Sequence, residues 1–383
     1  MEDLSFYFQP NNSANSTSGI GNVLQTNDEH GFPDLDKKGV AIFRVPEYRN
    51  SDLKPDNNAG ENIVAQFASL HTGDGWDFSI YDLGAVIPGE SFQDTSFAVA
   101  KIIEFLVKKE IIPVILGGSQ DLILSIYQGY ERLEQTVNIC SVDKALDVGD
   151  PESPLKSDAY VSHILMQRPC YLFNYASIGL QRPHVSKDEM ELFDKLYFDV
   201  CRLGAFNDNF RKAEPHLRNS DIINIDVEAI KGADIDPATY SRPNGFRSDQ
   251  ICQIAKYAGL SDKLSSFALF NIHADQSRYA DQLLAEVIWY FIDGYSQRMG
   301  DFPVGSKRNY KRFFVHLDDF EDDLTFYKSD RSGRWWLEVK YPSGKDKMYE
   351  RHHLVPCDYE DYTAAMENRI PDLWWKTLQK LTS

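Results

Sequence analysis

Three short stretches of this chain carry side chains that could bind a cation or handle protons. They are 117–121 (Gly-Gly-Ser-Gln-Asp), 143–147 (Asp-Lys-Ala-Leu-Asp) and 226–228 (Asp-Val-Glu). Four carboxylates in the second and third stretches would repel one another unless a cation lies among them or some are protonated. Oxygen-rich sites of this kind suit Mg²⁺, Ca²⁺ or Mn²⁺. Acidic residues at strand ends also serve as helix caps, so the spacing alone leaves both interpretations open.

The elements around these stretches predict a parallel sheet. Apolar residues at helical spacing over 96–110 are followed by a continuous apolar run over 111–116 and a second helical pattern over 122–132. Further apolar runs that end in polar residues lie at 137–142, 222–225 and 267–272. Open α/β sheets bind ligands at the carboxyl ends of their strands, so we expect the three stretches to converge there.

The alternation of helices and buried strands predicts an α/β protein with three layers, α/β/α, a mostly parallel sheet and a small C-terminal α+β appendage. We expect an irregular lead-in over 1–37, an α/β domain over 38–300 and the appendage over 301–383. The appendage pattern indicates a hairpin, a third strand near Met348 and a helix kinked at Pro371.

Composition excludes several classes of function. The chain has 383 residues, a formal net charge of −18 and 42% hydrophobic residues. Nucleic acids and anionic membranes attract clustered Lys and Arg, so we expect neither as a partner. No apolar run is long enough to span a bilayer, and five scattered cysteines show no disulfide or zinc spacing. We therefore expect a cytoplasmic protein without membrane insertion.

The order of these stretches resembles the ureohydrolase family of arginases, agmatinases and formiminoglutamases, the last most closely. Family members carry GGDH[ST], DAHxD and SxDxD motifs after parallel strands and hold two Mn²⁺ ions that bridge a hydroxide. Residues 117–121, 143–147 and 224–228 are similar to these motifs in that order. Residues 241–246 (Ser-Arg-Pro-Asn-Gly-Phe) are similar to a further formiminoglutamase segment. The resemblance covers about 39–298 and implies the arginase-like fold.

The chain departs from the family pattern at the metal ligands. Gln120 and Ala145 stand where the family has metal-binding histidines. Glu228 replaces an Asp, and Leu269 stands where the family has a substrate-handling Glu. The metal ligands that the resemblance implies are Asp143, Asp147, Asp226, Glu228 and, through its amide oxygen, Gln120.

Loss of imidazole ligands shifts a site away from transition metals towards harder, more weakly bound ions. We therefore expect either no cofactor or a single divalent cation, Mg²⁺, Ca²⁺ or Mn²⁺. The ammonium of Lys144 either folds inward in place of a cation or is solvated in its loop, and we expect the second. The resemblance implies His163 as a proton-shuttling catalytic residue, although an isolated histidine is more often structural. The pair His352-His353 is interpreted as surface.

Two functional hypotheses follow. In the first, the protein is a pseudoenzyme that has lost binuclear manganese catalysis and acts as a scaffold or regulatory partner. Its contact with a protein partner would be the aromatic-rich appendage, whose pairs Trp335-Trp336 and Trp374-Trp375 form either a core or a contact surface. In the second, it is an active C–N hydrolase on a formimino or amidino substrate, with two Mn²⁺ or a recast carboxylate site. The replaced metal ligands favour the first hypothesis. The resemblance also implies that the protein forms a homo-oligomer.

Overall fold

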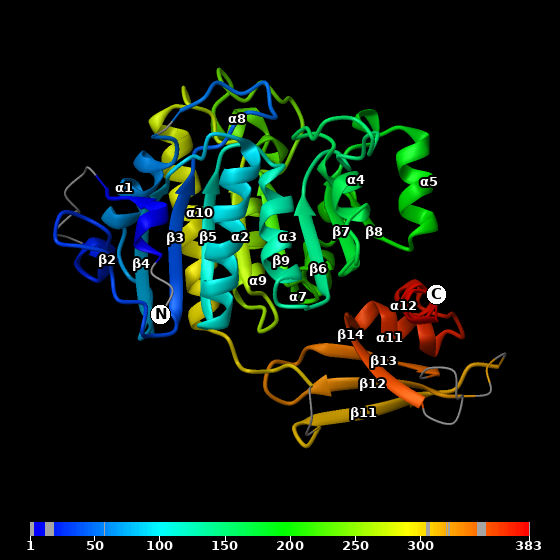
Figure 1. Ribbon diagram of the computed structural model, residues 1–383. Coiled ribbons are helices and arrows are strands. Elements are labelled where there is room, and N and C mark those ends of the chain that lie inside the picture. The colour runs from blue at the N-terminus through cyan, green and yellow to red at the C-terminus, as the bar shows by residue number, and fades with distance from the viewer. Residues whose placement is uncertain are drawn as a thin grey trace.

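The computed structural model describes residues 4–11, 19–56, 58–303, 307–318, 320, 322–342 and 350–382. Within this part of the chain, a large α/β body carries a smaller antiparallel sheet beneath it (Figure 1). The body confirms the predicted three-layer architecture with its mostly parallel sheet, and the small sheet lies in the predicted appendage.

The central sheet has ten strands among the described residues, and every pairing is parallel except that of β1 with β4. In spatial order they are β1 (Phe8–Gln9), β4 (Ser79–Val86), β3 (Gly39–Val45), β5 (Ile111–Gly117), β10 (Ser266–Phe270), β9 (Ile222–Asp226), β6 (Val137–Val142), β7 (Leu172–Leu180) and β8 (Asp199–Arg202), with β2 (Leu24–Thr26) paired to β4. Thus β1 and β2 bring part of the lead-in, 1–37, into the sheet.

Helices cover both faces of this sheet, and each face has its own hydrophobic core. One core contains residues from α1 (Glu61–Ser69), α6 (Ala205–Asp208), α7 (Ala213–Arg218), α8 (Gly232–Ile235), α9 (Ser248–Gly259) and α10 (Arg278–Ser296). The other contains residues from α2 (Phe92–Lys108), α3 (Leu122–Glu131), α4 (Tyr160–Leu165) and α5 (Lys187–Lys195). Strands buried on both faces explain why the sequence shows continuous apolar runs rather than alternation. No described helix is long and apolar enough to cross a membrane.

The C-terminal appendage is a four-stranded antiparallel sheet backed by two helices. Its elements are β11 (Tyr310–Val315), β12 (Leu324–Ser329), β13 (Trp335–Pro342), β14 (Glu350–Cys357), α11 (Tyr359–Met366) and α12 (Asp372–Thr382). The predicted hairpin is β12–β13, and the single kinked helix is instead two helices that end and restart around Pro371. The strand expected near Met348 lies outside the described residues.

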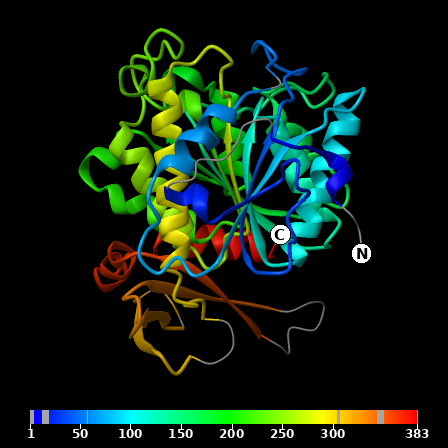
Figure 2. The same cartoon turned by 90° about the vertical axis from the view of Figure 1, so that its left-hand side faces the viewer.

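The appendage docks on the body through buried side chains. Both terminal nitrogens of Arg218, on α7, donate to the carbonyl of Trp335 at 3.1 Å, and one also donates to that of Cys357. The guanidinium lies 4.4 Å from the ring centroid of Trp336. The interpretation of His353 as surface is wrong, because its ring packs against Phe173 of β7. Figure 2 shows the appendage beneath the body from the side.

Candidate functional site

The predicted site residues follow four neighbouring strands. In the sheet, β5, β10, β9 and β6 are adjacent and parallel. Phe270 of β10 lies opposite Asp226 at the end of β9, and Val142 of β6 lies opposite Ile225. Residues that follow these positions must therefore meet at one edge of the sheet, as the strand pattern predicted.

The loop after β5 approaches the neighbouring chain too closely for any side chain. A Cβ at Gly118 would lie 1.9 Å from the carbonyl oxygen of Glu47. The backbone N–H of Gly118 donates to Val45, and that of Ser119 donates to Glu47, both at 2.9 Å. Glycine is thus required here by close packing, and the turn places Gln120 over the ends of the strands.

The loops after β6 and β9 are held by the same local hydrogen bond. The carboxylate of Asp143 accepts the backbone N–H of Ala145 at 3.0 Å, and that of Asp226 accepts the N–H of Glu228 at 2.9 Å. A carboxylate that bonds the backbone two residues on stabilises a tight turn. One oxygen of each aspartate therefore holds its own loop.

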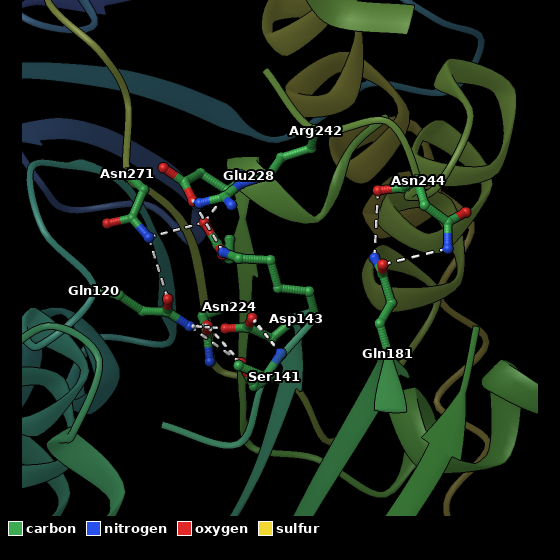
Figure 3. Close-up of polar contacts among 12 residues, drawn as sticks. Gln120, Ser141, Asp143, Gln181, Asn224, Glu228, Arg242, Asn244 and Asn271 are labelled. Atoms are coloured by element: carbon green, nitrogen blue, oxygen red, sulfur yellow. Dashed lines mark hydrogen bonds and ion pairs between the residues drawn. The ribbon is translucent and has the colours of Figure 1, made fainter. Parts of the chain in front are cut away.

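Gln120 connects three of the strand ends (Figure 3). Its Nε2 lies 2.6 Å from Oδ2 of Asp143 and 3.2 Å from Oδ1 of Asn224, and its Oε1 accepts from Asn271 at 3.3 Å. An ionised carboxylate only accepts hydrogen bonds, so the NH₂ end of the amide must face Asp143. Gln120 thus donates to a carboxylate, whereas a metal ligand would direct its oxygen towards a shared cation.

Lys144 lies inside the carboxylate cluster, and the expectation that it is solvated is wrong. Its Nζ is 3.0 Å from Oδ2 of Asp226 and 2.9 Å from Oε2 of Glu228, and its side chain is only 15% exposed. Two carboxylates that are themselves largely buried need a nearby positive charge. The ammonium supplies that charge from within the chain.

Two further residues reach Glu228 from segments beyond the three stretches. Nη2 of Arg242 lies 2.7 Å from its Oε2, and Nε2 of His273 lies 3.4 Å from its Oε1. Gln181, at the end of β7, exchanges hydrogen bonds of 3.3 Å with Asn244 and so holds the loop that carries Arg242. Sequence reasoning placed Arg242 only within a similar segment and gave it no role, because its partner is remote in the chain.

The charges of the cluster reinforce one another. Burial by itself would lower the pKa of Lys144, but Asp226, Asp143 and Glu228 outweigh it and raise that pKa. Burial would raise the pKa of Glu228, but the contacts of His273, Lys144 and Arg242 outweigh it and hold that pKa well below its usual range. Burial raises the pKa of Asp226 to about 6. Lys144 and Glu228 therefore form a charged pair near neutral pH.

Asp147 also belongs to the cluster, next to Asp143. Burial, and then the neighbouring Asp143, raise the pKa of its carboxyl well above the usual range. His163 belongs elsewhere: it lines a cavity with Phe97 and Leu155, and its Nε2 is buried without a hydrogen-bond partner. The geometry thus brings together the five residues proposed as metal ligands and leaves the proposed catalytic histidine outside them.

Tyr160 of α4 is a buried member of the network that no motif indicated. Its hydroxyl lies 3.3 Å from Nε2 of Gln120 and 2.7 Å from the hydroxyl of Tyr175. Burial raises the pKa of both tyrosines well above the usual range, so both hydroxyls keep their protons. Nothing in the sequence around Tyr160 distinguishes it from an ordinary core tyrosine.

The residues present do not fit a pair of Mn²⁺ ions. No group of three or more His, Cys, Asp or Glu side chains in the described part of the chain is arranged to hold a metal ion. The imidazole positions are taken by Gln120 and Ala145, and Lys144 occupies the space between two acidic side chains where a cation would lie. Most polar atoms of the cluster bond one another, and the amide nitrogen of Asn224 is the buried exception in this network.

Comparison with known proteins gives one consistent fold. Trypanosoma cruzi formiminoglutamase with manganese superposes with a TM-score of 0.62 at 14% identity, covering 68% of this chain and 95% of that one. Formimidoylglutamase from Bacillus subtilis superposes with a TM-score of 0.63 at 15% identity, and the match covers 76% of this chain and 97% of that one. Agmatine ureohydrolase of Thermoplasma volcanium superposes with a TM-score of 0.59 at 17% identity, and the match covers 69% of this chain and 92% of that one.

Comparisons of sequence match a smaller part of the chain than the structural comparisons do. No family model matches the chain. An uncharacterized 32.2 kDa protein of Methanothermus fervidus is 27% identical over 143 residues, which are 35% of this chain. The match spans 48% of that relative, about half its length. The structural matches each cover more than nine-tenths of a solved enzyme chain, so this chain has the fold of the arginase superfamily, the fold of formiminoglutamases and agmatine ureohydrolases.

Proposed function

We propose that this protein is a member of the ureohydrolase family in which an internal ion-pair network has replaced the binuclear metal centre, and that it acts as a scaffold or regulatory partner rather than as a hydrolase. The observation that carries the proposal is the position of the Lys144 ammonium, within 3.0 Å of both Asp226 and Glu228. The arginase-superfamily fold and the order of the three motifs support the family membership.

Replacement of the metal removes the nucleophile. Two Lewis-acidic ions lower the pKa of a bridging water, and a lysine ammonium has no such coordination to offer. A divalent ion would have to displace Lys144 against the attraction of both carboxylates, and no imidazole remains at positions 120 and 145 to hold it. The site is therefore a stable polar core element instead of a water-activating centre.

A working C–N hydrolase is the second candidate, and one observation favours it. Asp143, Asp226 and Glu228 do converge, and His273 adds a ring nitrogen 3.4 Å from Glu228. In that case Lys144 would have to withdraw and one Mg²⁺, Ca²⁺ or Mn²⁺ ion would take its place. The two candidates thus differ in whether a cation competes with Lys144.

The scaffold role rests on the appendage. Trp335 belongs to the appendage core and Trp374 packs against that core. Trp336 is also buried, but it lies at the junction with the body, against Arg218. Trp375 is 50% exposed, and Tyr359 and Met366 on α11 are also exposed. We place the contact with a protein partner on this part of α11 and α12, in a cytoplasmic setting.

Metal analysis of the purified protein tests the proposal. After dialysis against a buffer that contains Mn²⁺, we expect the protein to retain less than one equivalent of the ion. We also expect no change in melting temperature on addition of EDTA or Mn²⁺, and no hydrolysis of formiminoglutamate, agmatine or arginine. Two bound equivalents of Mn²⁺ together with hydrolysis of any of these substrates would overturn it.

A rebuilt site provides the matched comparison. The variant Gln120→His/Lys144→Ala/Ala145→His restores the histidine of each of the first two motifs and removes the internal cation. We expect this variant, unlike the natural chain, to bind Mn²⁺ and to melt at a higher temperature with the ion than without it. Equal Mn²⁺ responses in the two proteins would contradict the role given to Lys144.

A further inference from the structure

A cavity of about 640 Å³ lies where the appendage meets the edge of the central sheet. One wall comes from β8 and α7 of the body, and the other comes from α11, α12 and the turn between them. It shares no lining residue with the cluster of Asp143, Lys144 and Glu228. Any chemistry in this cavity is therefore separate from that cluster.

The cavity wall carries a cysteine and a histidine in contact. Sγ of Cys201, on β8, lies 3.2 Å from Nε2 of His216, on α7. Both residues line the cavity, and Cys201 is half-buried with a free thiol. A thiol within hydrogen-bond distance of an imidazole is the arrangement that activates cysteine as a nucleophile, because the imidazole accepts its proton and then stabilises the thiolate.

The surroundings favour the charged form of the imidazole. Burial opposes protonation of His216, but Cys201 and Asp199 outweigh it and raise the pKa of His216 to about 9. Asp361 of α11 and Lys376 of α12 also interact with His216, and the buried thiol of Cys140 on β6 interacts with Cys201. Asp199 is itself paired with Lys376 at 3.4 Å, which holds the acidic group near His216.

We propose that Cys201 and His216 form a reactive thiol site that undergoes exchange with a small zwitterionic disulfide, such as an amino-acid or short-peptide disulfide. The Cys201 sulfur attacks one sulfur of the disulfide, a new S–S bond forms and the old one breaks. The leaving thiolate takes the proton held by His216, so one half of the disulfide is released as a thiol. Cys201 is oxidised to the mixed disulfide, and the disulfide supplies the oxidant.

The charges of the cavity select this class of ligand. Lys212 and Glu360 line it as an ion pair of 3.3 Å, and their side chains are 42% and 59% exposed. Such an exposed pair contributes little to stability and can exchange its partners for the carboxylate and ammonium of a ligand. Ile370 and Leu373 provide an apolar wall beside them.

The exposed Cys170 is an internal control, because accessibility alone predicts that it reacts first. The full chain is treated at pH 7 with glutathione disulfide, and each cysteine is quantified by peptide mass spectrometry. We expect Cys201 to be thiolated about tenfold faster than Cys170, since an unactivated thiol is only a few per cent ionised at this pH. Faster modification of Cys170 would overturn the proposal.

Two variants and a second probe sharpen the result. His216→Gln should slow thiolation of Cys201 about tenfold and leave Cys170 unchanged, whereas an unchanged Cys201 rate would overturn the role of His216. Lys212→Met should slow glutathione disulfide but not the neutral bis(2-hydroxyethyl) disulfide, and equal effects would overturn the zwitterion assignment. If His216→Gln does not fold, the rates of iodoacetamide alkylation in the natural chain decide, and Cys201 must then react faster than the more exposed Cys170.

Discussion

Two buried cations, Lys144 at the strand ends and Arg218 at the junction with the appendage, are held in opposite ways. Lys144 faces carboxylates, which raise its pKa despite burial. Arg218 faces two backbone carbonyls, an aromatic ring and Glu214, and burial lowers its pKa. The position of the Lys144 ammonium stabilises any positive charge, because the carboxylates of Asp226 and Glu228 both face it. The position of Arg218 requires a group that stays charged and directs several donors at once, which only guanidinium does.

This difference explains what each cation does for the fold. Lys144 lies at the place where the resemblance implies a metal, and it neutralises side chains of the same domain. Arg218 ties two parts of the chain together by satisfying carbonyls at the ends of β13 and β14. One cation therefore pairs with carboxylates inside the body, and the other connects the body to the appendage.

Loss of the junction cation should have the largest effect. Arg218→Ala leaves Glu214 and two buried carbonyls without this donor, so we expect the free energy of unfolding to fall by about 3–5 kcal/mol. Urea denaturation measures this loss. Arg247→Ala, which removes an exposed pair with Asp249, should cost less than about 0.5 kcal/mol. Equal losses in the two variants would break the comparison.

Removal of the cation at the strand ends should cost somewhat less. Lys144→Met removes the ammonium that faces Asp226 and Glu228, but Arg242 and His273 still face Glu228, so we expect a loss of about 2–4 kcal/mol. Millimolar Mg²⁺ or Mn²⁺ should return part of this stability in the variant only, measured by thermal melting. Lys187→Met, which removes an exposed lysine, is the control. If neither ion raises the melting temperature of Lys144→Met, no divalent cation can take the place of the ammonium.

The smallest effect concerns a buried neutral group at the junction. Burial lowers the pKa of His353 to about 4, so between about pH 6.5 and 4 the unfolded chain binds more protons than the folded one. The contribution of His353 is therefore complete above about pH 6.5 and is lost as the pH falls, by about 1–3 kcal/mol.

His353→Gln should reduce this pH dependence, measured as the difference in unfolding free energy between variant and natural chain at several pH values. His352→Gln provides a neighbouring control, because His352 is exposed and contacts Glu338 instead. If both variants change the pH dependence alike, burial of His353 is not its cause.

The sequence predicted the strand-end positions of Asp143 and Asp226 because parallel strands with polar ends have one arrangement available to them. It did not predict β7 and β8 as strands, because buried polar residues interrupt their apolar character. Asn174 of β7 is tolerated there because it donates to Asp199 of β8 and accepts from Lys380 of α12. Arg218 gave no signal either, since the two carbonyls that it bonds lie more than a hundred residues away.

Sequence alone determined the fold class and the replacement of Gln120 and Ala145 at the histidine positions, because hydrophobic periodicity and residue identity are local properties. Only the tertiary structure decided that Lys144 turns inward and that Cys201 meets His216. Both depend on desolvation and on partners from distant strands and helices, and no local pattern encodes which charge another segment will bring beside a lysine or a thiol.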